Sequence, residues 1–432
     1  MSSIVIGNNT LDRISHLPPN IIEQILMRLP LRDAIRTSIL SHDWRYAWSS
    51  IPHLAFSWQE FPLSICNYSQ VNFDRKLVDI IHQVLLLHQG PIHRFELSIQ
   101  LRNSKDIDGW LLFLSRNDIR EIILHRWEGE VYKLPSCLLS CKGLRSLSLH
   151  RCMFRPVHFQ GFPRLASLFL RSVAISQDGL EALITACPLL NKLCLIDMFD
   201  FGGLKVCSPS LVNLTFVGEH IDLAFENVPL LATLSVSLTV KSDKYYAAPG
   251  VICKLFRILY HLPSIKKIVL GGQAFKVWTY GELPIQLPCT YQLKHFHATV
   301  NFKDMQEMFA IVSLCRSCPL LVTLELEARF VMQANHETPV EKFWNSQQSF
   351  DCLFSQLKNL EITGVSSILE LPFLKFVLAN APVLETAYIG FDYRLKTELD
   401  ITREMIKFRR LSPAAEIKIL KRKFRNASSM WA

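Results

Sequence analysis

The chain has 432 residues, of which 49% are hydrophobic and 20% charged, and 65 of them are leucine. This composition excludes a wholly disordered chain and a small disulfide-held scaffold, because it can bury the core of several domain-sized units. The formal charge of +9 is concentrated from Asp400 onward, without a base-contacting module around it. We predict that residues 422–432 form a solvated basic tail, with a nuclear localisation signal as the alternative.

The sequence gives no indication of a membrane or secretory protein. No hydrophobic run reaches the ~20 residues that a membrane-spanning helix needs, so no membrane partner is expected. The first ten residues lack the basic and apolar stretches of a secretory signal. We therefore expect a cytoplasmic and/or nuclear protein whose twelve cysteines are reduced thiols.

Residues 10–55 predict a small module of three helices. The first is indicated by apolar residues at helical spacing, which are Ile21, Ile22, Ile25, Leu26 and Leu29. The second is expected over 32–40, with four residues turned inward, Ala34, Ile35, Ser38 and Ile39. The third would begin at Ser41 and carry Trp44 and Trp48. Such a core is marginal alone, so the module is expected to need a partner or the next segment.

A helical linker is predicted over 56–90, and repeats of one phrase, L-x-x-L-x-L, over 91–349. The phrase is often preceded by proline, as in 187–195 and 228–236. Its first apolar positions are Ile92, Ile119, Leu144, Leu165, Leu190, Leu211, Leu231, Ile265, Leu293, Leu321, Leu357 and Leu384. Most successive copies are separated by distances within or near the roughly 20–29 residues of a leucine-rich repeat.

The phrase also predicts how the repeats pack. Its last two apolar residues lie on one face of a short strand, and the residues between them lie on the other. One strand-plus-helix unit cannot bury its apolar side, so the copies must stack. We predict an α/β solenoid, a parallel-stranded arc, in which residues 350–421 supply the last repeats and a cap. A strand near 417–420 would close the sheet edge.

The N-terminal module resembles the F-box of plant F-box proteins. The residues that carry the resemblance are Leu17-Pro18, Ile21, Ile25-Leu26, Leu29-Pro30, Ala34, Arg36-Thr37-Ser38, Leu40-Ser41, Trp44-Arg45 and Trp48. At His42-Asp43 the family commonly has basic residues, and we expect this departure to tune binding rather than abolish it.

The C-terminal part resembles the FBD domain in three segments, 352–364, 374–385 and 408–417. The order of the parts is that of the plant F-box/FBD/leucine-rich-repeat proteins, with an N-terminal three-helix F-box, a leucine-rich-repeat solenoid and an FBD-type cap. The resemblance implies the substrate-recognition subunit of an SCF-type cullin-RING E3 ubiquitin ligase. Its F-box would dock the Skp adaptor, and through it a cullin scaffold, while the repeats hold a protein substrate of unknown identity.

Carried over position by position, the resemblance implies adaptor binding by Leu17, Pro18, Ile21, Ile25, Leu26, Leu29, Pro30, Ala34, Ser38, Leu40 and Trp44. The apolar members of this set would look the same in the core of any small helical bundle. The Leu-Pro pairs at both ends of the first helix favour the docking interpretation.

In the predicted solenoid the outward strand positions form the concave face, where solenoids bind their partners. The substrate-face residues are Ser146, Ser148, His150, Phe169, Arg171, Lys192, Asn213, Thr215, Ser235, Lys267, Glu325 and Glu361. Their mixture of hydroxyls, amides and both charges suits a protein better than a phosphate-rich polymer, so no nucleic-acid partner is expected. Any single one of them could equally be a solvated residue, so the prediction concerns the face.

We predict no catalytic residue, no metal site and no cofactor. The short motifs of phosphate, dinucleotide, zinc-protease and hydrolase sites are absent from the sequence. Cys315 and Cys318 have the spacing of half a zinc site, but no second pair follows at a finger-like distance. Cys318 and Cys187 precede strands and Cys152 occupies a repeat turn, so all are expected to be buried structural residues. The chain is thus predicted to be an adaptor rather than an enzyme.

The competing hypothesis is a non-ligase repeat scaffold that binds a protein or a small signalling ligand. In that case the helical module would be the N-terminal cap of the solenoid. A cap would bury the apolar side of Ile21, Ile25 and Leu29 against the first repeat near Ile92, whereas a docking module would leave that side exposed.

Overall fold

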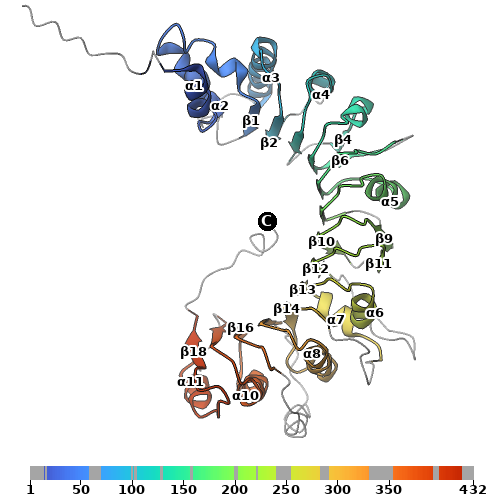
Figure 1. The fold of residues 1–432 in the computed structure, drawn as a ribbon, viewed down its shortest axis with the longest axis vertical. Coiled ribbons are helices and arrows are strands. Elements are labelled where there is room, and N and C mark those ends of the chain that lie inside the picture. Colours follow the sequence, from blue (N-terminus) through green and yellow to red (C-terminus); the bar gives the residue numbers. More distant parts are fainter. Residues whose placement is uncertain are drawn as a thin grey trace, which may run out of the picture. The chain divides into compact units, whose positions relative to one another are not determined.

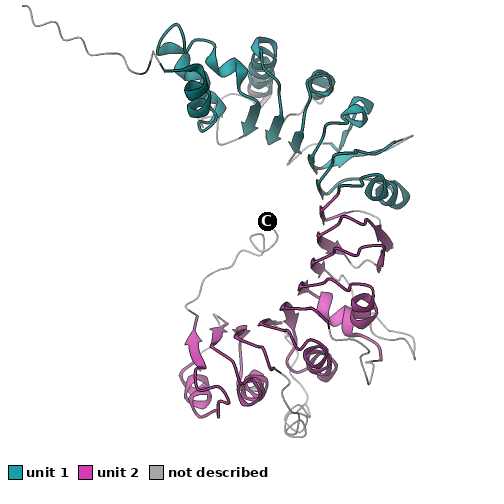
Figure 2. Cartoon of the chain, viewed as in Figure 1, with its two compact units in different colours: residues 1–189 teal, residues 190–432 magenta. Residues whose placement is uncertain are grey.

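The computed structural model describes residues 14, 17–57, 70–98, 101, 105–126, 130–155, 159–198, 203–219, 222–239, 254–282, 291–329, 354–392 and 398–420. The chain divides into two compact units, 1–189 and 190–432 (Figure 2). Within each unit, parallel strands stack side by side and the helices lie on one side of them (Figure 1). The predicted tail, 422–432, lies outside the described residues.

Unit 1 begins with the helical module and continues as a stack of strands. Its helices are α1 (Pro19–Leu26), α2 (Leu31–Arg36), α3 (Gln70–Leu87), α4 (Lys105–Ser115) and α5 (Gln177–Thr185). Short 3-10 helices are η1 (Thr37–Ile39), η2 (Ala47–Ser50) and η4 (Ser136–Ser140). The strands of the main sheet are β1 (His53–Ser57), β2 (Arg94–Ser98), β3 (Glu121–His125), β5 (Ser146–His150) and β7 (Ser167–Arg171), and β4 (Tyr132–Lys133) pairs with β6 (Cys152–Met153).

Two of the three predicted helices in the module are confirmed, and the third is wrong. After Ser41 the chain forms turns and then η2, not an α-helix. Trp44 is 2% exposed and its indole Nε1 donates a hydrogen bond to the carbonyl of Ile14 at 3.0 Å. Tertiary packing of this ring therefore sets the local backbone. Ile39, predicted to point inward, is 88% exposed because α2 tightens into η1 at Thr37 and its residues rotate to a different face.

Strand β1 joins the module directly to the repeats. Ile51, Leu54 and Phe56 follow the L-x-x-L-x-L spacing and are buried, which makes this a first copy that the sequence analysis missed. The carbonyl of Ser49 accepts hydrogen bonds from the backbone N–H groups of Gln89 and Gly90, at 2.8 and 3.4 Å. A Cβ on Gly90 would lie 2.9 Å from the carbonyl oxygen of Ser50, so this close approach requires glycine.

Unit 2 continues the same repeat. Its main sheet has the order β8 (Lys192–Ile196), β10 (Asn213–Glu219), β12 (Thr233–Thr239), β13 (Lys267–Gly272), β14 (His295–Val300), β15 (Thr323–Ala328), β16 (Asn359–Val365), β17 (Thr386–Phe391) and β18 (Glu416–Ile419). A second small sheet pairs β9 (Gly203–Cys207) with β11 (Asp222–Glu226). The helices are α6 (Lys254–Tyr260), α7 (Ala274–Thr279), α8 (Met305–Ser317), α10 (Leu371–Asn380) and α11 (Glu398–Ile406), with the 3-10 helix η5 (Ile368–Glu370).

The repeat phrase describes the core of both units. Every first apolar position named above is buried, with at most 3% exposure at Leu321. The strand pairs among the described residues are parallel, and their outward residues lie in register from strand to strand, with one shift between β16 and β17. The predicted strand near 417–420 is confirmed as β18, which pairs with β17. The α/β repeat architecture predicted from the sequence is therefore confirmed within each unit.

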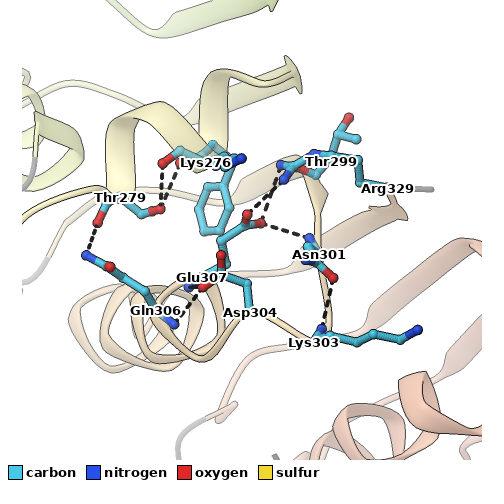
Figure 3. Close-up of polar contacts among 10 residues, drawn as sticks. Lys276, Thr279, Thr299, Asn301, Lys303, Asp304, Gln306, Glu307 and Arg329 are labelled. Atoms are coloured by element: carbon cyan, nitrogen blue, oxygen red, sulfur yellow. Dashed lines mark hydrogen bonds and ion pairs between the residues drawn. The ribbon is translucent and has the colours of Figure 1, made fainter. Parts of the chain in front are cut away.

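A buried ion pair fixes the ends of β14 and β15 in unit 2 (Figure 3). Glu307 at the start of α8 is 1% exposed, and its Oε1 accepts from Nη1 of Arg329 at 2.8 Å. Its Oε2 accepts from the backbone N–H of Asn301 at 2.8 Å, while Nη2 of Arg329 donates to the carbonyl of Thr299 at 2.9 Å. Burial raises the pKa of Glu307, and the Arg329 charge opposes that shift.

Candidate functional site

The sequence places two apolar stripes on α1, and the structure turns them in different directions. Ile22 and Leu26 are buried in the module core. Ile21 and Ile25, one position earlier in the helix, are rotated by about 100° and reach solvent. Ile21, Ile25 and the following Leu29 are 36%, 37% and 38% exposed, and we call these three the apolar outer face.

The other predicted adaptor-binding residues divide in the same way. Pro18, Pro30 and Leu40 are exposed, whereas Leu17 and Ser38 are half-buried. Leu26, Ala34 and Trp44 have at most 2% exposure. These three residues therefore form the core of the module and are not available as surface contacts. Their apolar character and helical spacing fit both roles, so the sequence did not separate them.

The module packs on the first repeat through other elements. Helix α2 lies against β1, whereas the contacts of α1 and α2 with η2 are internal to the module. Ile92 of the first predicted repeat is fully buried, yet the apolar outer face remains open to solvent. This is the arrangement expected of a docking module, and it differs from the buried apolar side expected of a simple cap.

The strand face of unit 1, meaning the outward side chains of β1 to β7, carries ion pairs. Arg94 lies 3.0 Å from Glu96 and 3.1 Å from Glu121. The hydroxyl of Ser98 also donates to Glu96 at 2.9 Å. Charges on β2 and β3 are thus satisfied by their neighbours in the sheet.

A histidine cluster continues the same face. Nε2 of His125 lies 2.8 Å from Oγ of Ser148, and its ring contacts the rings of His150 and Phe169 at centroid distances of 6.3 and 6.2 Å. Burial lowers the pKa of His150 to about 4, and the adjacent Arg171 adds to the effect. Burial also lowers the pKa of His125. The structure therefore brings together four predicted face residues around a histidine that was not predicted.

The strand face of unit 2, the outward side chains of β8 to β18, contains a hollow over β13, β14 and β15. Its volume is about 210 Å³, and its polar lining residues are Lys267, His295, His297, Thr323 and Glu325. Nδ1 of His297 lies 3.4 Å from Oε2 of Glu325. Of these residues, Lys267 and Glu325 were predicted from the sequence as substrate-face residues. His295 and His297 occupy the two outward strand positions of the copy that begins at Leu293, in register with Lys267 and Val269. The repeat pattern could therefore have predicted both histidines as face residues.

The remaining predicted face residues are spread along the two strand faces. Those that are exposed or half-buried are Ser146, Lys192, Asn213, Thr215 and Glu361. Ser235 is only 9% exposed and His150 only 7%, so these two are covered rather than open. Ser235 lies in register between Thr215 and Val269, and parallel strands about 4.8 Å apart let larger neighbours cover a small side chain.

The cysteines have the structural role predicted for them. Cys152, Cys187, Cys315 and Cys318 are at most 1% exposed. Burial raises the pKa of Cys152 and of Cys318 to about 12, so both stay protonated thiols near neutral pH. Within the described ranges no three His, Cys, Asp or Glu side chains come together as a metal site. No helix in those ranges combines the length and apolarity needed to cross a membrane.

Comparison with protein families matches three segments in the predicted order. Residues 14–55 match the F-box domain, and residues 347–389 match the FBD domain. Residues 107–326 match the leucine-rich repeats of FBD-associated F-box protein At5g56370. The three matches together extend over most of the chain.

Full-length relatives have the same organisation. The F-box/FBD/LRR-repeat protein At1g13570 of Arabidopsis thaliana is 38% identical over 424 residues, which cover 95% of this chain and 98% of the relative. The F-box/FBD/LRR-repeat protein At5g22660 of the same plant is 26% identical, over 95% of this chain and 97% of the relative. Together with the fold and the exposed face of α1, these matches confirm the resemblance: the chain belongs to the F-box/FBD/leucine-rich-repeat family.

Proposed function

We propose that this chain is the substrate-recognition subunit of an SCF-type cullin-RING E3 ubiquitin ligase. Its F-box docks the Skp adaptor, and through it a cullin scaffold, and the strand faces of the repeats hold a protein target. The chain itself contributes binding and not catalysis. The single observation that carries the proposal is the apolar outer face, because Ile21, Ile25 and Leu29 stay open although the module is packed on the first repeat.

Exposed apolar side chains gain free energy when a partner removes them from water. Three large aliphatic residues within one short segment are stabilised when a partner covers them, at about 25 cal/mol for each Å² removed from water. Interfaces concentrate their binding energy in a few such anchors near the centre of the contact. Pro18 and Pro30 bracket this segment and fix the entry of both helices, so the anchors are held in place before binding.

The test is capture of a purified Skp adaptor by the full-length protein and by the Ile25→Asp variant. Ile25 is partly exposed, so a charge there should leave the fold intact while disrupting an apolar contact. We expect capture to fall by about tenfold or more, which corresponds to ~1.4 kcal/mol. Circular dichroism melting should show an unchanged transition.

The matched control is Leu86→Asp, because Leu86 on α3 is 84% exposed and outside the module. This variant should capture the adaptor like the wild type. Folded wild-type protein that captures no adaptor would overturn the proposal and favour the scaffold hypothesis, in which the module acts only as a cap.

A further inference from the structure

The hollow on the strand face of unit 2 is built from three neighbouring strands in register. Lys267, His295 and Thr323 form one row across β13, β14 and β15. His297 and Glu325 belong to the next row. Because the hollow has a volume of about 210 Å³, it is smaller than the roughly 300–1,000 Å³ of sites for drug-sized ligands. It has the size to receive one side chain rather than a cofactor.

The environment of His297 is the second observation at this hollow. Its side chain is 9% exposed, and its Nδ1 is buried without a hydrogen-bond partner among the described residues. Glu325 lies near this nitrogen, at 3.4 Å, but the contact is not aligned as a hydrogen bond. A buried polar atom left unsatisfied destabilises the folded state, so a ligand that completes the polar contacts in this hollow would recover part of that cost.

The charges at the rim identify the ligand chemistry. Lys267 and His295 line the hollow and are exposed, and the exposed Lys266 and Lys294 directly precede them in the chain. The backbone N–H of Lys294 donates to the carbonyl of Lys266 at 2.8 Å, so these two positions are neighbours. No ion pair within the described residues involves any of these three lysines. The carboxylate that lines the hollow, Glu325, lies beside His297. The lysines therefore create a positive field that attracts an anion.

We propose that this hollow binds one acidic side chain, a carboxylate or a phosphoryl group, from an extended segment of the target protein. Lys267 and His295 donate to the anionic oxygens, the Thr323 hydroxyl donates to or accepts from neighbouring polar groups of the segment, and Glu325 accepts from its N–H groups. The inference deepens the proposed function by naming the chemical class that its target-holding face recognises.

Binding of synthetic peptides to the full-length protein, measured by fluorescence anisotropy, tests the proposal. The peptides share one neutral host sequence with a central Glu, phosphoserine, Gln or Ser, and a duplex DNA oligonucleotide is the polyanion control. We expect the Glu or phosphoserine peptide to bind at least about fivefold more tightly than its neutral match. The stronger of these two acidic peptides identifies the carboxylate or the phosphoryl group as the source.

Variants locate the binding site. Lys267→Ala/His295→Ala changes two exposed residues and should abolish the preference for the acidic peptide. Lys375→Ala removes an exposed lysine on α10, outside the strand face, and should preserve it. Equal binding of acidic and neutral peptides, no binding of any peptide, binding of DNA alone, or an equal loss in both variants would each overturn the proposal. The assay contains no Skp adaptor, so its outcome is independent of the adaptor-capture test.

Discussion

The strand faces of the two units share one repeat phrase and use its outward positions differently. In unit 1 the face is closed by its own contacts, because Arg94 pairs with Glu96 and Glu121, and His125 contacts Ser148. In unit 2 the ion pair of Glu307 lies buried at the strand ends, while the face presents lysines and a histidine nitrogen without a partner among the described residues. The phrase thus fixes the core and leaves the outward rows free to become either a stabilising network or a binding surface.

The largest effect should come from breaking the buried pair beneath the unit 2 face. Glu307→Ala leaves the Arg329 guanidinium, whose side chain is 12% exposed, without its carboxylate. We expect a loss of about 3 kcal/mol or more in the free energy of unfolding, measured by urea denaturation. The control is Glu404→Ala, which removes an exposed partner of Lys407 and should change stability by less than about 0.5 kcal/mol. Similar losses in both variants would contradict the importance of burial.

Acidification should lower the stability of the folded protein through the histidine cluster of unit 1. The pKa of His150 is about 4 in the folded state, against about 6.5 when unfolded, so the unfolded chain binds more protons between these values. Stability conferred by the neutral ring is present above pH 6.5 and is lost as pH falls toward 4. We expect His150→Gln to flatten this decline by about 1–3 kcal/mol, measured from denaturation curves across that range.

The exposed His295 provides the control for the acid effect. His295→Gln should retain the pH dependence of the wild type, because this side chain is not enclosed by the unit 1 cluster. A His150→Gln variant whose stability declined as steeply as the wild type would show that acid sensitivity arises elsewhere.

The smallest change in stability is expected from breaking the ion pairs on the unit 1 face. Arg94→Ala should lower the free energy of unfolding by about 0.5–1 kcal/mol, because the Arg94 side chain is 36% exposed and solvent screens the pairs. It should leave acidic-peptide binding unchanged. Lys267→Ala/His295→Ala should show the opposite pattern, with altered binding and stability within about 0.5 kcal/mol of the wild type. The comparison fails if both variants change the same property.

The repeats could be predicted well because every copy must bury its apolar positions in the same way. Positions such as Leu190 and Leu231 must be buried in every turn of a solenoid, and the alternation of side chains along a strand then fixes which residues point outward. The β1 copy was missed because Ile51, Leu54 and Phe56 directly follow the helical module, where helical signals dominate the local sequence.

The candidate docking and binding surfaces were harder to predict for a different reason. Apolar spacing on α1 marks two adjacent stripes, and only packing decides that Leu26 turns inward while Ile25 turns outward. The turn at Trp44 depends on a contact with Ile14, which no local pattern reveals. Register alone could have named His297, but its burial and unpartnered nitrogen depend on the neighbouring strands.

The joint between the module and the first repeat has a mechanical consequence. Only Ile51 and Pro52 separate η2 from β1, and the carbonyl of Ser49 is held by the chain that leads into β2. The helical module and the first strands of unit 1 are therefore joined by a short connection and by backbone hydrogen bonds. The spacing between the apolar outer face of α1 and the first strands is therefore set by this geometry and not by a flexible linker. Lengthening the joint with flexible residues would release this fixed spacing.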